Sequence, residues 1–143
     1  MASSNSSHML SDEAAESLRS AGLRPTRQRI AIANLLLAGP PRHISAEQLR
    51  DELLSGGQPM ALATIYNCLH QFAEAGLLRP VHHVGDAVLY DTNLSDHFHF
   101  IDVETGELMD IDSSNFTLPD LPDLPEGYEA ESIELSVRLR RKR

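Results

Sequence analysis

Residues 61–76 read ALATIYNCLHQFAEAG, and the spacing of their apolar side chains decides the fold of the first half of the chain. An apolar stripe would run along a helix over these residues, with members three or four positions apart: Leu62, Ile65, Leu69 and Phe72. The opposite face would carry small or hydrogen-bonding side chains with a single charge: Ala63, Thr64, Asn67, His70, Gln71 and Glu74. We therefore predict a helix over 61–75 that packs on a core with one face and leaves a nearly uncharged polar face outward.

Three further helices are predicted before this segment. Ser11 precedes two acids and an Ala/Leu run, which is typical of a helix N-cap and leaves residues 1–10 as a flexible tail. Pro25-Thr26 opens a second helix, with proline at a position where its missing N–H costs little. Ser45 and Gln48 have the spacing of a capping box at the start of a third helix.

A β-hairpin is predicted after the fourth helix, from alternating runs over 77–84 and 87–91 that flank Gly85-Asp86. Helices followed by a hairpin are typical of a winged helix, whose last helix enters the major groove of DNA. We therefore predict an α+β protein. A winged-helix DNA-binding domain would occupy residues 1–92, and a small α/β dimerisation domain residues 93–143.

The second half has the pattern of a small sheet. Strands are predicted over 97–103, 107–111 and 133–139, and the Pro/Asp-rich segment 118–125 is expected to contain a short irregular helix. About fifty residues with three short strands bury little surface alone, so this half is expected to dimerise, as a dimer or within a tetramer.

The net charge of −9 averages two regions of opposite sign. Residues 17–50 hold six arginines against one acid, whereas residues 81–137 hold fourteen acids and no lysine or arginine. Because screening confines a charge to about 10 Å in ordinary salt, the basic region can still attract phosphates. Double-stranded DNA therefore remains a candidate partner of the first half.

Composition excludes several other classes of protein. No apolar run reaches the length of a transmembrane helix, and the first eight residues lack the charge and apolar stretch of a secretory signal. Cys68 is the only cysteine, so the chain has no internal disulfide and no structural zinc site with four thiolates. We expect a cytoplasmic protein with no membrane partner.

Two histidines of one predicted strand, His97 and His99, are candidate metal ligands. Alternate residues of a strand point to the same face about 7 Å apart, so both imidazoles can reach one ion. Asp91, Asp110 and His43 are within plausible reach to complete the site. Such a set suits Fe(II), Mn(II) or Zn(II) without selecting strongly among them. Taken alone, the two histidines are a weak signal, which also fits exposed side chains on an acidic surface.

Several segments, in their order and spacing, resemble the ferric uptake regulator (Fur) family. They are Gly22-Leu-Arg-Pro-Thr-Arg-Gln-Arg29, His43-Ile-Ser-Ala-Glu47, Ala63-Thr-Ile-Tyr-Asn67, Glu74-Ala-Gly-Leu-Leu78, Tyr90-Asp91 and His97-Phe-His99. Asn67 stands where most members have arginine. The sequence that follows it, Cys68-Leu-His-Gln-Phe72, is similar to that of the iron response regulator (Irr) branch. The resemblance covers about residues 17–112 and implies a regulator of iron homeostasis that represses or activates transcription.

The resemblance implies a regulatory metal site between the two domains. By position, this site maps onto His43, Asp91, His97, His99 and Asp110. Aspartate at two of these positions is similar to peroxide-sensing relatives, so peroxide or manganese sensing is an alternative to iron sensing. The Irr branch also implies haem. However, the Cys-Pro haem motif of some members is missing, so haem would have to use a histidine such as His97 or His99.

For DNA, the resemblance implies that the 61–75 helix reads the major groove. Thr64 and Asn67 project from its polar face, and Tyr66 at the edge of the stripe either packs in the core or touches DNA. The expected phosphate or minor-groove contacts come from three arginines: Arg24, Arg27 and Arg29. A metal joining the two domains would set the spacing of the two reading helices of a homodimer.

Two other function classes remain open on the sequence alone. An Fe(II) metalloenzyme could use two histidines and a carboxylate, but it leaves the arginine-rich helices unexplained. A repressor that needs no metal would make the histidines incidental, and the metal content of the purified protein separates this case from the first.

Overall fold

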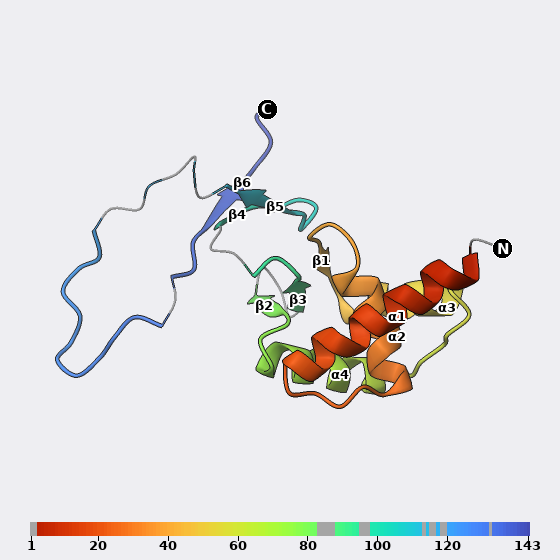
Figure 1. Cartoon of the computed structure of the whole chain (residues 1–143). Coiled ribbons are helices and arrows are strands. Elements are labelled where there is room, and N and C mark those ends of the chain that lie inside the picture. The colour runs from red at the N-terminus through yellow and green to blue at the C-terminus, as the bar shows by residue number, and fades with distance from the viewer. Residues whose placement is uncertain are drawn as a thin grey trace. The chain divides into compact units, whose positions relative to one another are not determined.

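The computed structural model describes residues 3–82, 88–94, 98–112, 114, 117, 120–131 and 133–143 (Figure 1). The chain divides into two compact units, Met1–Leu94 and Ser95–Arg143. The sequence placed this boundary two residues earlier, after residue 92. Helices and strands occur together, so the predicted α+β class is confirmed.

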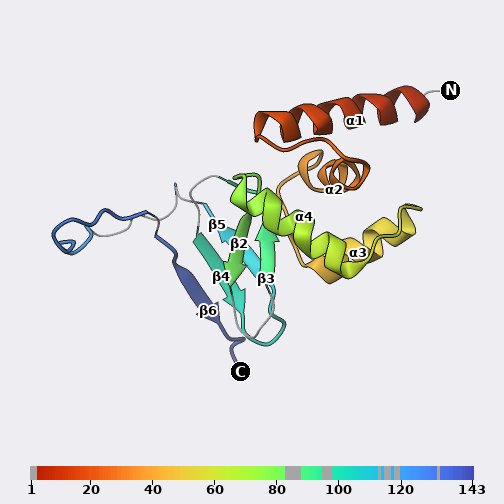
Figure 2. The same cartoon turned by 90° about the horizontal axis from the view of Figure 1, so that it is seen from below.

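The first unit contains four helices and three strands. The helices are α1 (Ser3–Ser20), α2 (Arg27–Leu37), α3 (Ala46–Ser55) and α4 (Leu62–Glu74). The strands are β1 (His43–Ile44), β2 (Arg79–His82) and β3 (Val88–Asp91). Helix α1 packs on α2, and both α2 and α3 pack on α4 (Figure 2). The core lies among these helices, and its large fully buried aliphatic and aromatic side chains are Leu18, Ile32, Leu36, Ile44, Leu49, Leu53, Ile65, Leu69 and Phe72.

Helix α4 confirms the predicted pattern. Ile65, Leu69 and Phe72 are fully buried, and Cys68 joins them on the inner face. Burial of a side chain of this size contributes about 1.5–3 kcal/mol, so this stripe holds α4 against the core. The helix ends one residue before Ala75, and Gly76 follows with a positive φ of 80° that suits glycine.

The starts of α2 and α3 follow from their caps. The Thr26 hydroxyl accepts a hydrogen bond from the Arg29 N–H, so Thr26 is the N-cap of α2 and Pro25 lies just outside the helix. Ser45 and Gln48 form the predicted capping box at the start of α3, with both hydrogen bonds present.

Helix α1 begins at Ser3 and not at Ser11, so residues 3–10, expected to be a flexible tail, are helical. Residues 3–20 contain neither proline nor glycine, and serine and asparagine lower helix propensity only by about 0.5 kcal/mol each. The helix therefore continues through the Ser/Asn-rich segment, and Asp12 and Glu13 lie in its middle. Ala14 and Leu18 anchor it on the core.

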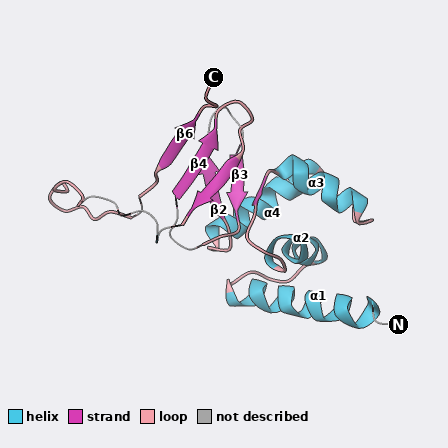
Figure 3. Ribbon diagram, turned by 90° about the horizontal axis from the view of Figure 1, so that it is seen from above, coloured by secondary structure: helices cyan, strands magenta, loops and turns pink. Residues whose placement is uncertain are grey.

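The small sheet of the first unit has the order β1-β3-β2 with antiparallel pairing throughout. Strands β2 and β3 form the predicted hairpin arms, which Figure 3 shows as neighbouring strands; the predicted turn at Gly85-Asp86 lies outside the described residues. Strand β1 was not predicted, because two residues show no periodicity. It places His43 opposite Asp91 and buried Ile44 opposite Tyr90.

The second unit contains a three-stranded sheet of β4 (Phe98–Asp102), β5 (Leu108–Ile111) and β6 (Ser136–Leu139), in the order β5-β4-β6. Strand β5 is antiparallel to β4, and β6 is parallel to it. In the described part of this unit the structure has strands and no α-helix. Residues 120–125 are irregular rather than a short helix, because three prolines in 118–125 leave few backbone donors, and residues 118 and 119 lie outside the described ranges.

Candidate functional site

The outward face of α4 is polar and carries little charge. Asn67 and His70 are exposed, Thr64 is half-buried, and the one acid of the helix, Glu74, pairs with His70 at 3.2 Å. Amide and hydroxyl groups can both donate and accept hydrogen bonds, which is how side chains read base edges in the major groove. This face is therefore suited to contact with a polyanion that carries hydrogen-bonding groups.

Of the two roles predicted for Tyr66, packing in the core is wrong, and contact with DNA stays a prediction. Its side chain is 42% exposed, so it is no core residue, and its hydroxyl donates to Glu47 Oε1 at 2.9 Å. The Glu47 backbone N–H and then this hydroxyl lower the pKa of Glu47, and the hydrogen bond to Glu47 raises the pKa of Tyr66. Glu47 of α3 thus holds the aromatic ring of α4, a pairing that sequence spacing could not reveal.

The arginines near α2 fall into two groups. The half-buried Arg29 guanidinium donates to the Arg24 carbonyl and to Gln71 Oε1, each at 2.8 Å, and so joins α2 to α4. Arg24 and Arg27 are exposed, and no hydrogen bond or ion pair of their side chains occurs within the described ranges. Arg42 is already neutralised by Glu52 at 2.7 Å. Arg24 and Arg27 are therefore cations that an external anion can reach.

A histidine–aspartate pair spans β1 and β3 of the first unit. His43 Nε2 lies 3.1 Å from Asp91 Oδ2, and the Asp91 side chain is almost fully buried. The other carboxylate oxygen accepts the Asn93 N–H at 2.9 Å. The antiparallel register of β1 and β3 places the two side chains opposite each other, so the backbone pairing itself builds this pair.

A second pair of the same kind spans β4 and β5 of the second unit. His99 and Asp110 are opposite each other in the antiparallel register, with His99 Nε2 3.3 Å from Asp110 Oδ1. His99 is buried and Asp110 is 37% exposed. The predicted ligand His97 lies outside the described residues. Each of these two pairs therefore offers an imidazole and a carboxylate that can serve together as nitrogen and oxygen ligands of a divalent ion.

Cys68 adds no ligand to either pair. Its thiol is buried on the inner face of α4, and burial raises its pKa. A metal-binding cysteine acts as the thiolate, which this environment disfavours. The donors available to a metal in the described part of the chain are thus imidazoles and carboxylates.

Comparison with known proteins decides the family. The model of the ferric uptake regulator family matches residues 20–138. The chain belongs to this family. The ferric uptake regulation protein of Pseudomonas aeruginosa is 33% identical over 128 residues, which cover 88% of this chain and 96% of that protein. Its counterpart in Pseudomonas fluorescens is 35% identical over 115 residues, or 80% of this chain and 89% of the relative.

Solved structures of the Fur family agree with the fold. The regulator from P. aeruginosa with manganese superposes with a TM-score of 0.73 at 28% identity, covering 91% of this chain and 98% of that one. The Vibrio cholerae regulator superposes with a TM-score of 0.68 at 25% identity, covering 89% and 98%.

Fur-family membership sets the class of function. Members are metal-responsive transcriptional regulators and not enzymes, so the Fe(II) metalloenzyme alternative is set aside. No helix in the described part of this Fur-family chain is long and apolar enough to span a membrane.

Proposed function

We propose that this chain is a homodimeric regulator that binds double-stranded DNA through α4 and responds to a divalent metal. The first unit would be a winged-helix DNA-binding domain, with Thr64, Tyr66 and Asn67 facing the major groove and Arg24 and Arg27 on phosphates. Arg29 would support this surface by holding α4 to α2. The observation that carries the DNA-binding part is the polar, nearly uncharged outer face of α4 beside two unpartnered arginines.

The second unit would hold the dimer together. Large apolar side chains lie exposed in its described part: Met109, Leu121, Leu124, Tyr128, Ile133 and Val137. Exposed apolar surface of this extent in so small a unit favours burial against another chain. A dimer would present two copies of α4 to the two halves of a dyad operator.

The metal would be held by His43, Asp91, His97, His99 and Asp110, drawn from both units. The two His–Asp pairs support this, because each supplies an imidazole and a carboxylate on a rigid strand pair. A set of imidazoles and carboxylates favours a bare divalent ion over haem. Fe(II) and Mn(II) are the first candidates, and Zn(II) also suits these ligands. The P. aeruginosa relative was solved with manganese and a Francisella tularensis structure of the same fold with iron, which agrees with this choice.

The proposed response follows from ligands that belong to different units. An ion that takes donors from both restricts their relative orientation, and a ligand shifts a conformational equilibrium by its difference in affinity for the two states. The V. cholerae relative is described as showing a rearrangement of its DNA-binding domains. In this chain, the metal would select the orientation that sets the spacing of the two α4 helices.

The test is fluorescence anisotropy with an AT-rich dyad duplex at fixed salt, comparing chelated protein with protein plus Mn(II). We expect Mn(II) to change affinity by at least fivefold, the lower end of ordinary allosteric coupling. Asp110→Asn should abolish this change, whereas Asp112→Asn, the same substitution at an exposed neighbour, should keep it. Equal affinity with and without Mn(II) would remove the metal as effector, and no binding in either state would refute DNA recognition.

A further inference from the structure

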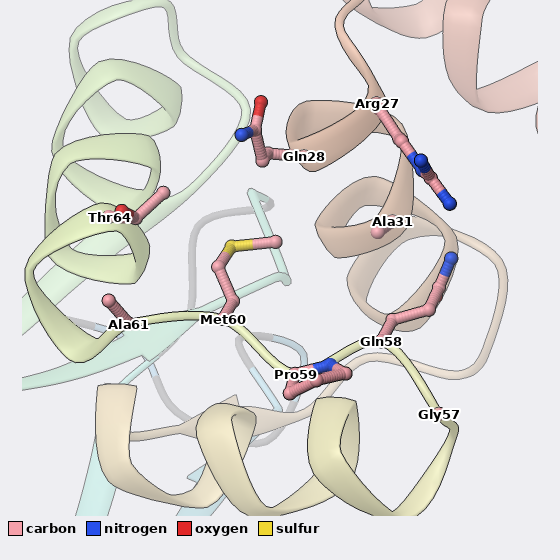
Figure 4. Close-up of a pocket in the computed structure, with 9 residues that line it drawn as sticks. All are labelled: Arg27, Gln28, Ala31, Gly57, Gln58, Pro59, Met60, Ala61 and Thr64. Carbon is pink, nitrogen blue, oxygen red and sulfur yellow. The ribbon is translucent and has the colours of Figure 1, made fainter.

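A cleft of about 380 Å³ lies in the first unit between the start of α2, the loop after α3 and the first turn of α4. Figure 4 shows Arg27 entering it from α2, Gln58 and Met60 from the loop, and Thr64 from α4, while the Gln28 amide points away from Arg27 and Gln58. The Arg27 and Gln58 side chains point toward each other along one side of the cleft (Figure 4). Three segments distant in sequence thus converge on one space.

The lining of the cleft is suited to an anion. It contains one cation and three hydrogen-bonding side chains, and no acid, although the chain as a whole has a net charge of −9. Among the described residues nothing neutralises Arg27, whereas the nearby Arg29 and Arg42 are both engaged within the unit. An arginine fork with an amide donor beside it is an arrangement that binds phosphate oxygens.

We propose that this cleft binds a phosphodiester group of the DNA backbone, with Gln58 as the donor beside Arg27. The inference rests on the proposed DNA binding and deepens it. It assigns a phosphate contact to the loop between α3 and α4, outside the helix that faces the bases. The loop is held for this role by the hydrogen bond from the Gln58 N–H to the Leu53 carbonyl, so its side chain starts from a fixed backbone position. Such contacts fix the register of a protein on the duplex without reading sequence.

Gln58→Glu tests the site because it keeps the shape of the side chain but places a negative charge against Arg27 and the phosphate. We expect at least tenfold weaker binding of a random-sequence duplex at 50 mM salt and a salt slope smaller by about 0.9, the value of one lost phosphate contact. Gln48→Glu is the matched control, since it makes the same change and preserves the α3 capping box. It should weaken binding less than threefold and leave the slope unchanged.

Two further variants separate charge from geometry. Gln58→Ala removes only a neutral hydrogen bond and should weaken binding about three- to tenfold with an unchanged salt slope. In the Arg27→Ala background, Gln58→Glu should cost much less than in the wild type, because both side chains serve the same phosphate. Equal costs in the two backgrounds would overturn the shared site.

Three outcomes distinguish the failures. A wild-type protein that binds no duplex overturns both the proposed function and this inference. A wild type that binds, with Gln58→Glu behaving like Gln48→Glu, overturns this inference alone. Inorganic phosphate titrated at constant ionic strength identifies the other source of the same chemistry: if it shifts the Gln58 side-chain amide resonances and the duplex does not, the cleft binds free phosphate and the DNA assignment is wrong.

Discussion

Arg27 and Arg29 lie two residues apart on α2. Replacing Arg29 by alanine should lower stability, whereas replacing Arg27 should weaken DNA binding. Arg29→Ala removes two hydrogen bonds from a charged donor, each worth about 1.5–3 kcal/mol when fully buried. Because Arg29 is half-buried, we discount this sum by about half and expect a loss of about 2 kcal/mol. With a urea m-value of about 2 kcal/mol per molar, the unfolding midpoint of the first unit should fall by about 1 M.

Arg27→Ala should leave that midpoint nearly unchanged and act on DNA binding. Loss of one phosphate contact lowers the salt slope by about 0.9, so the drop in affinity between 50 and 200 mM salt should shrink by a factor of about 3.5. The two variants share the helix, the substitution and nearly the same position, so propensity and helix-dipole effects are closely matched.

The measurements are urea unfolding followed by the helical circular dichroism signal, and anisotropy with one duplex across a salt series. The reasoning is refuted if Arg29→Ala unfolds at the wild-type urea concentration and also lowers the salt slope. Arg29 would then contact DNA, and its bonds to Arg24 and Gln71 would contribute nothing to folding.

Three other substitutions test other parts of the structure. Ser45→Ala removes one half of the α3 capping box and should lower the free energy of unfolding by about 1 kcal/mol, as measured by urea unfolding; no change would count against the cap. Tyr66→Phe should raise the pKa of Glu47 toward its ordinary value in an NMR titration, because the hydroxyl favours the ionised carboxylate; the associated stability is present above that ordinary value and is lost as pH falls through the lowered pKa. Asp91→Asn should weaken Mn(II) binding at least tenfold by isothermal calorimetry while keeping the Asn93 N–H bonded, and an unchanged affinity would exclude Asp91 as a ligand.

Elements with a local cause could be predicted from the sequence. The α4 stripe and the α3 capping box depend on side chains within one or two turns, and both were confirmed. The predicted start of α1 was wrong. Ser11 has the features of an N-cap, but residues 3–10 contain no proline or glycine, so the helix extends N-terminally through them.

Contacts between distant segments were beyond sequence reasoning. Strand β1 exists because β3 pairs with it across 48 residues, and a two-residue strand has no pattern of its own. The hydrogen bond between Arg29 and Gln71 likewise depends on how α2 packs on α4. The sequence around Arg29 therefore indicated a basic residue but not its structural partner. The four candidate ligands were predicted individually. Which histidine faces which aspartate was not, because this depends on the register of the paired strands.

Five consecutive residues, 43–47, serve five separate purposes in the first unit. His43 faces Asp91, Ile44 enters the core, Ser45 caps α3, and Glu47 holds Tyr66, while the buried Ala46 lets α3 pack closely. A single inserted residue here would turn His43 to the other side of its strand or shift Glu47 by about 100° around α3. This short segment should therefore tolerate no change in length. The candidate metal ligand His43 is therefore only four residues along the backbone from Glu47, whose carboxylate accepts the Tyr66 hydroxyl hydrogen bond.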